Sequence, residues 1–132
     1  MKKIVGFLIV VLLIGCASKK EDITIDTAVQ TNKLSEAYSF KIKEIISDSR
    51  CPIGVNCVWA GEVELVLSIY KEGVFYKEEP LIIGFKNFPE NKLLLEKYIS
   101  NKKIQNIAVL PEKKQDVEIS LEDYSLKIDL EN

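Results

Sequence analysis

The stretch that decides the fold is VWAGEVELVLSIYKEGVFYK, residues 58–77. Apolar residues alternate with others in its first part, where one face of an extended chain would carry Val63, Leu65, Leu67 and Ile69. Successive side chains of a strand point to opposite sides, so this alternation is typical of a half-buried strand. Gly73 then lies in a turn, and a second apolar run follows at residues 74–77. The pattern predicts a strand over residues 58–70 that returns as a β-hairpin.

Shorter segments of the same kind lie on both sides of this hairpin. Alternating or short apolar runs predict further strands at residues 23–25, 39–46, 81–85, 102–110, 117–121 and 124–130. Residues 89–100 fit either a short helix, which Pro89 near the start favours, or one more strand. The chain is therefore predicted to be all-β, an antiparallel β-sandwich of about seven strands, with one short helix if residues 89–100 are helical.

The N-terminus has the pattern of a secretory signal. Lys2 and Lys3 precede an apolar run over residues 4–14, and small residues surround Cys16. The run is shorter than the ~20 residues that cross a bilayer as a helix; a buried helix or strand is the competing interpretation. The segment Leu13-Ile14-Gly15-Cys16 resembles the bacterial lipobox. This resemblance implies cleavage before Cys16 and a diacylglycerol on its thiol.

The resemblance to a lipoprotein signal also predicts how the chain is organised. A signal peptide would cover residues 1–15, a lipidated N-terminus and tether residues 16–33, and the β-sandwich domain residues 34–132. Several acyl chains anchor a protein stably, since each buried CH₂ contributes ~0.8 kcal/mol. Ala17 is not Asp, so nothing resembles the inner-membrane retention signal, and we expect a cell-envelope protein held at the outer membrane.

A further resemblance concerns the face of that membrane. The segment Lys20-Glu21-Asp22 resembles an export tag that would place the protein on the cell surface. Three charged residues after an anchor are also ordinary in a solvated tether, so surface display stays one of two options.

The cysteines indicate a disulfide. The chain has three, and lipid on Cys16 leaves Cys51 and Cys57 as an even pair in an oxidising compartment. Their C-x₅-C spacing is not the C-x-x-C of redox pairs. The chain has no histidine, so a zinc site lacks ligands. We expect a structural disulfide between Cys51 and Cys57.

The loop that holds these cysteines carries a motif. Residues 48–62 read DSRCPIGVNCVWAGE and are similar to a D-S-R-C-P-x-x-V-x-C-x-W-x-G pattern of small bacterial lipoproteins. The closing segment DYSLKI, residues 123–128, resembles the last strand of the same family. The resemblance covers the central loop, the strand after it and the C-terminus, and it implies no enzyme activity.

One interpretation makes this loop a rigid corner. Pro52 fixes its φ and Gly54 permits a positive φ, so the ring can turn tightly. Asp48 can accept backbone N–H groups in an Asx turn, and Arg50 can pair with Asp48 or Glu62. Trp59 would then lay its ring on the disulfide or cap the end of the sandwich.

The other interpretation makes the loop a binding surface. A stapled loop has little ordering entropy left to lose when it binds. The residues that would contact a partner are Arg50, Ile53, Val55, Asn56 and Trp59.

The composition argues against several classes of function. Removing residues 1–15 takes away two lysines and no acid, so the net charge falls from −2 to −4. This acidity argues against nucleic acid as a partner and against a polybasic membrane-binding face. Without histidine there is no Ser-His-Asp triad or Cys-His dyad. No nucleotide-binding or calcium-binding loop motif occurs either, so we expect no cofactor and no metal.

We therefore expect a non-enzymatic, membrane-anchored lipoprotein that binds a protein or a cell-envelope component. One alternative is an inhibitor or immunity-type protein whose Cys51–Cys57 loop enters the active site of an enzyme. A second alternative is a carbohydrate-active domain, which would need a pair of carboxylates in a deep cleft.

Overall fold

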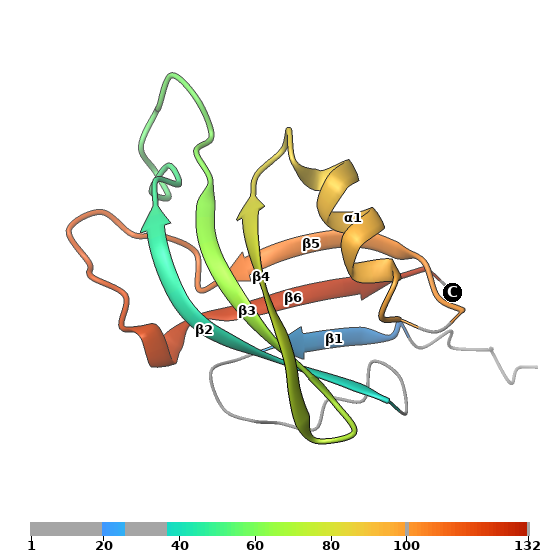
Figure 1. Ribbon diagram of the computed structural model, residues 1–132. Helices are drawn as coiled ribbons and strands as arrows, with labels where there is room; N and C mark the ends of the chain where they lie inside the picture. Colours follow the sequence, from blue (N-terminus) through green and yellow to red (C-terminus); the bar gives the residue numbers. More distant parts are fainter. Residues whose placement is uncertain (1–19, 26–36, 100, 132) are drawn as a thin grey trace, which may run out of the picture.

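The structure, a computed structural model, describes residues 20–25, 37–99 and 101–131. In these residues six strands form two antiparallel sheets around one core, with one α-helix (Figure 1). The central sheet has the order β2-β3-β4 and the terminal sheet the order β1-β6-β5. The elements are β1 (Asp22–Ile25), β2 (Tyr38–Asp48), β3 (Val63–Lys71), β4 (Val74–Ile83), α1 (Phe88–Glu96), β5 (Ile104–Leu110) and β6 (Ser125–Leu130). The predicted all-β sandwich fold is confirmed, and α1 is the short helix that was one of the two options for this part of the chain.

The central sheet is built on the hairpin that the sequence predicted. The alternating residues of β3 are fully buried: Val63, Leu65, Leu67 and Ile69. On the other face of β3, Val66 and Ser68 are buried as well, because β2 and β4 flank this strand on both sides. An ion pair of 3.0 Å between Lys43 of β2 and Glu78 of β4 joins the two outer strands.

Strand β2 explains an irregularity in the sequence pattern. Its inward residues Phe40 and Ile42 are two apart, but the next apolar residue, Ile45, is three further on. The pairing of β2 with β3 shifts between Ile42 and Glu44. Such a bulge adds one residue to a strand and restores the alternation after it. Ile45 is therefore packed against the core, whereas its neighbour Ile46 is exposed.

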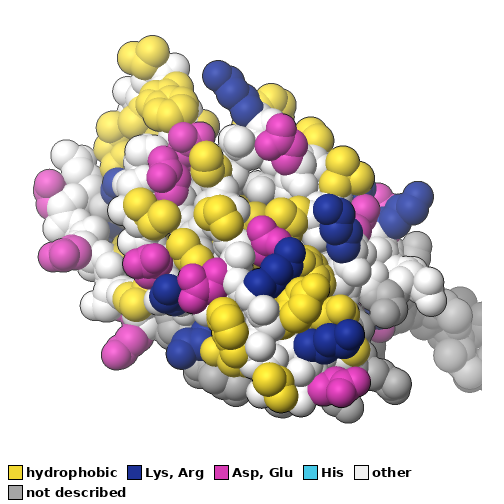
Figure 2. All heavy atoms as spheres, viewed as in Figure 1, with side chains coloured by type: hydrophobic (Ala, Val, Ile, Leu, Met, Phe, Trp, Pro, Cys, Tyr) yellow, Lys and Arg dark blue, Asp and Glu magenta, His cyan; other side chains and the backbone are white. Residues whose placement is uncertain are grey.

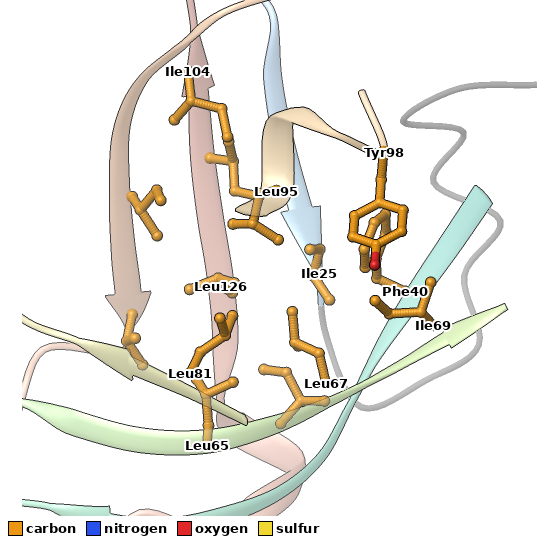
Figure 3. Packing of buried hydrophobic residues seen from close by; sticks show 14 of the residues in the cluster. Ile25, Phe40, Leu65, Leu67, Ile69, Leu81, Leu95, Tyr98, Ile104 and Leu126 are labelled. Atoms are coloured by element: carbon orange, nitrogen blue, oxygen red, sulfur yellow. The ribbon is translucent and has the colours of Figure 1, made fainter. Parts of the chain in front are cut away.

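Helix α1 lies between the edge strands β4 and β5 of the two sheets (Figure 1). Pro89 occupies the first turn, where its missing N–H costs nothing. The buried Asn91 side chain donates a hydrogen bond of 2.8 Å to the Ile82 carbonyl, and Glu96 accepts one of 2.8 Å from the Ile104 N–H. Figure 3 shows Leu95 from this helix among core residues of the two sheets. The helix thus closes one side of the sandwich.

Strand β1 lies within residues 16–33, the segment that was expected to be a tether. It pairs antiparallel with β6, from Asp22 opposite Asp129 to Ile25 opposite Leu126. The edge strand indicated at residues 23–25 is confirmed, and the sheet therefore begins before residue 34. The proposed signal peptide and Cys16 lie outside the described residues. In the part of the chain that is described, no helix is long and apolar enough to span a bilayer.

Four predicted strands differ from the observed ones. Residues 117–121 are not a strand: only Ile119 packs against the core, Val117 and Leu121 are exposed, and a 3₁₀ turn follows at Leu121–Asp123. The strand predicted from residue 58 begins at Val63, after the loop. The two runs at 74–77 and 81–85 form the single strand β4, since Pro80 between them is tolerated on an edge strand.

The helix gives a direct test of the packing. Leu95 is 1% exposed and Leu93 is 66% exposed on the same helix. We expect Leu95→Ala to lower the free energy of unfolding by about 2–5 kcal/mol, because it leaves a cavity in the core. Leu93→Ala should change it by less than about 0.5 kcal/mol. Urea denaturation of both variants measures the difference; equal losses would mean that α1 is packed otherwise.

Candidate functional site

The most distinctive feature is the loop that joins β2 to β3. Cys51 and Cys57 form the predicted disulfide, with their Cα atoms 5.9 Å apart, and residues 51–57 are called the stapled loop from here on. Backbone hydrogen bonds close its neck, from the Ser49 N–H to the Glu62 carbonyl and from the Cys51 N–H to the Ala60 carbonyl. Inside the ring the Val55 N–H bonds to the Pro52 carbonyl, which makes the tight turn.

Two glycines permit this loop to form. Gly54, at the turn, has the positive φ that the sequence predicted, +77°. Gly61, at the neck, has φ +75°, and a Cβ atom there would lie 2.0 Å from the Ser49 carbonyl oxygen. A side chain is excluded at that position by both conformation and space. This backbone also explains why β3 begins at Val63 and not at residue 58, where the sequence predicted it.

Four residues form a clamp at the base of the stapled loop: Asp48, Arg50, Lys113 and Tyr124. The Arg50 guanidinium donates to both carboxylate oxygens of Asp48, from Nε at 2.9 Å and from Nη2 at 2.6 Å. Tyr124 donates its hydroxyl to Asp48 at 3.0 Å, and Lys113 Nζ donates to the Asp48 carbonyl at 2.6 Å. The Arg50 backbone N–H also bonds to the Asp48 side chain, which is the predicted Asx turn.

The clamp joins the two sheets. Asp48 ends β2 of the central sheet, and Tyr124 immediately precedes β6 of the terminal sheet. Arg50 Nη1 also donates to the carbonyl of Val109 in β5, at 2.7 Å, and to that of Pro111 at 3.0 Å. The guanidinium therefore satisfies carbonyl groups at the end of β5 while it pairs with a carboxylate from the opposite sheet.

The clamp shifts the acidity of its members. Burial alone would raise the pKa of Asp48, but the hydrogen bonds and charge of Arg50 and the hydroxyl of Tyr124 outweigh it, and the pKa is below its usual range. The pKa of Tyr124 is raised by burial and by its hydrogen bond to the Asp48 carboxylate. Asp48 is therefore ionised and Tyr124 protonated at neutral pH, and both states favour the closed clamp.

Above the clamp, apolar side chains face solvent. Ile53 is 55% exposed and Trp59 is 58% exposed, while Val55 and Val58 are exposed beside them. These four side chains are called the tip. Hydrophobic side chains gather over the stapled loop at the top of Figure 2. The tip is held in place by the disulfide and the clamp, so its apolar surface is not a consequence of an unfolded loop.

An open groove lies beside the tip. It has a volume of about 430 Å³ and runs between the stapled loop, the end of β4 and the outer edge of β5. Ile53, Ile83 and Phe88 are among the apolar residues that line it, and Phe85, which is almost fully exposed, contributes a further ring. A second hollow of about 500 Å³ continues past Phe85 and Phe88.

The positive and negative charges at the groove nearly cancel. The positive charge of Arg50 is neutralised by Asp48. Glu112 and Lys113 line one side with opposite charges, and the side chains of Asn91 and Asn106 are uncharged. A groove of this kind suits an uncharged, apolar segment rather than a charged ligand. In the described ranges no group of three or more Cys, Asp or Glu residues is placed to hold a metal ion.

The structure brings most of the predicted binding residues together. Ile53, Val55, Asn56 and Trp59 are all exposed on one loop. Trp59 does not cap the core, because more than half of its surface is open to solvent. Arg50 differs, since its side chain lies at the base in the clamp and pairs with Asp48 instead of Glu62.

The groove cannot be predicted from the sequence pattern. Its walls come from the stapled loop, the β4–α1 connection and β5, which are far apart in the sequence. The one available signal was Phe85, an aromatic residue beside Gly84 at the end of an apolar run.

The fold and this site together define a small β-sandwich-like domain with a rigid, apolar, disulfide-stapled loop at one end. Comparison with protein-family models, with curated proteins and with solved structures gives no match for the chain. What the domain does must therefore be inferred from its own surface.

Removal of the disulfide should destabilise the domain moderately. The ring has seven residues, so Cys51→Ser with Cys57→Ser should lower the free energy of unfolding by about 2 kcal/mol. The double variant leaves no free thiol at either position. Chemical denaturation with and without reductant measures the loss; a wild-type protein indifferent to reductant would contradict the prediction.

The clamp predicts a pH dependence. We expect Asp48→Asn to lower the free energy of unfolding by about 2 kcal/mol at pH 7, since hydrogen bonds to a charged partner are lost. The folded-state pKa of Asp48 is lowered, so its contribution is complete above the unfolded pKa, about 4, and is lost as pH falls through the lower folded value. The gap between wild type and Asp48→Asn should therefore narrow at acidic pH.

Denaturation curves from pH 7 down to pH 3 measure this gap. The lowered pKa of Asp129 acts in both proteins and cancels in the difference. A gap that stays constant over this range would show that the charge of Asp48 is not what stabilises the clamp.

Proposed function

We propose that the protein is a non-enzymatic lipoprotein, anchored in the cell envelope through lipid on Cys16, whose stapled loop binds a protein partner. The observation that carries this proposal is the tip, a set of apolar side chains exposed on a rigid loop beside an apolar groove. Exposed apolar surface of this kind costs solubility unless something covers it.

Several features of the tip support a protein partner. Trp59 is of a residue type that often dominates the free energy of protein–protein binding. The stapled loop is already ordered, so binding would lose little conformational entropy. The groove beside it has nearly balanced charge and suits an apolar side chain from the partner.

The outer membrane, with display on the cell surface as an alternative, is the proposed location.

A second candidate function follows from the shape of the loop. Ile53 and Val55 are exposed and not packed under Trp59, so the stapled loop has side chains to insert into a cleft. An inhibitor or immunity-type protein would use the loop in this way, with an enzyme as the partner. The two proposals share one surface and differ in whether the partner loses activity.

The test uses the full-length, lipidated protein as bait in cells that make it, followed by binding measurements with the purified partner. We expect Trp59→Ala to weaken binding at least tenfold, about 1.4 kcal/mol, while the free energy of unfolding changes little. Phe85→Ala should weaken binding too, since Phe85 lines the groove.

Val117→Ala is the matched control, because Val117 is an exposed apolar residue that belongs neither to the tip nor to the lining of the groove. It should bind as the wild type does. A partner held equally well by Trp59→Ala and by Val117→Ala would place the binding surface elsewhere. Inhibition of an enzymatic partner by the wild type, lost in Trp59→Ala, would favour the second candidate function.

A further inference from the structure

The other end of the central sheet also exposes apolar side chains. We propose that the β3–β4 hairpin, residues 71–77, rests on the bilayer that holds the lipid anchor and keeps the tip facing away from that bilayer. The inference rests on the lipidation of Cys16 proposed above. It assigns to the hairpin a membrane surface as its partner.

The hairpin has the composition of an interfacial segment. Val74, Phe75 and Tyr76 follow one another and are all more than half exposed. Lys71 and Lys77 flank them, and each ammonium group lies within 6 Å of the centre of a tyrosine ring, at 5.8 Å for Lys71 over Tyr38 and 5.9 Å for Lys77 over Tyr76. Hydrophobic side chains lie beside a basic and an acidic one at the lower edge of Figure 2, over this hairpin.

This mixture suits the boundary between headgroups and acyl chains. Aromatic rings and lysines favour that boundary because each has an apolar body and a polar end. Lys77 is paired with Glu79, and Glu72 in the turn offsets Lys71. The hairpin is therefore close to neutral, so its binding would depend on burial of apolar side chains rather than on attraction to anionic lipid.

The hairpin lies at the end of the domain where the chain leads toward Cys16. Tyr76 contacts Tyr38, and Tyr38 contacts Tyr98 just after α1, with ring centres 6.2 and 5.2 Å apart. Four residues after Tyr98, Lys102 forms an ion pair with Glu21. These ring contacts lead from the hairpin to Tyr98, and Lys102, close after it in the sequence, is paired with Glu21 just before β1.

The remaining link to the lipid is short. The Leu130 N–H donates to the Glu21 carbonyl, so the chain is held on the terminal sheet at that residue, just before β1. From Cys16 to Glu21 the chain reaches at most ~17 Å, at ~3.4 Å per residue. A lipid on Cys16 would therefore hold this end of the domain at the bilayer surface, within reach of the hairpin.

The tip lies at the opposite end. Strand β3 runs from Val63, beside the neck of the stapled loop, to Lys71 at the hairpin. Its nine residues separate the two ends by roughly 30 Å, at ~3.3 Å per residue. Figure 1 shows the stapled loop at the top and the hairpin at the bottom. A domain that rests on its hairpin would present the tip away from the membrane.

The single tryptophan of the chain makes the arrangement measurable. The full-length lipidated protein is reconstituted in phosphatidylcholine vesicles that contain lipid brominated near the headgroup, which quenches tryptophan in the interface. In the wild type, Trp59 at the tip should not be quenched by bromine and should remain accessible to acrylamide in the water. In Trp59→Phe with Phe75→Trp, the fluorescence should be quenched by the brominated lipid and shielded from acrylamide.

The matched control is Trp59→Phe with Val117→Trp. Val117 is exposed to the same extent as Phe75 but lines a hollow with Ser47 and Asp48, at the end of β2 near the tip. We expect no bromine quenching in it. Circular dichroism checks that all variants are folded.

Two failures are distinguishable. If the mass of the N-terminal peptide shows no lipid on Cys16, the proposed anchoring is wrong and the inference with it. If the lipid is present and the Phe75→Trp variant is not quenched, the hairpin does not contact the membrane and the inference alone is overturned. Quenching of Trp59 in the wild type would overturn it too, since the tip would then be the membrane contact.

Discussion

The interaction on which the rest of the structure depends is the pairing of Asp48 with Arg50. Asp48 ends a strand of the central sheet, and Arg50 reaches the carbonyl groups at the end of β5 in the terminal sheet. Tyr124 adds its hydroxyl to the same carboxylate. The two sheets are therefore connected at this end by charge-assisted hydrogen bonds. The pair is partly buried, so the remaining hydrogen bonds are what offset its desolvation.

This pairing permits an exposed apolar loop. A hydrophobic loop without support would collapse onto the core or sample many conformations, since apolar surface is driven out of water. Here the clamp holds the base, the disulfide closes the ring, and Gly61 brings the neck against Ser49. The tip therefore keeps its shape in the absence of a partner. The proposed binding function depends on this rigidity, because it reduces the entropy lost on association.

The sequence predicted the fold through alternation and the disulfide through cysteine number. Alternation is a local signal, and the number of cysteines is a simple count, so neither requires knowledge of the tertiary structure. The first residue of β3 could not be predicted. The positive φ of Gly61 interrupts the extended backbone just before Val63, although apolar residues are also found upstream of it. Residues 117–121 alternate too, but they pair with none of the strands that the structure describes. The role of Arg50 in joining β5 to β2 depends on contacts some sixty residues apart, at Val109 and Pro111, which no local pattern contains.

The exposed part of the loop between β2 and β3 can change in sequence independently of the core. Residues 53–60 are all exposed, so none of their side chains belongs to the core. The scaffold below them is determined by the clamp, by Gly61 and by the disulfide. Substitutions of the exposed residues Ile53, Val55 and Asn56 can alter the proposed binding surface while the free energy of folding stays nearly constant. The domain thus separates the residues that specify its architecture from those to which we assign binding, so the proposed binding surface can change while the scaffold stays the same.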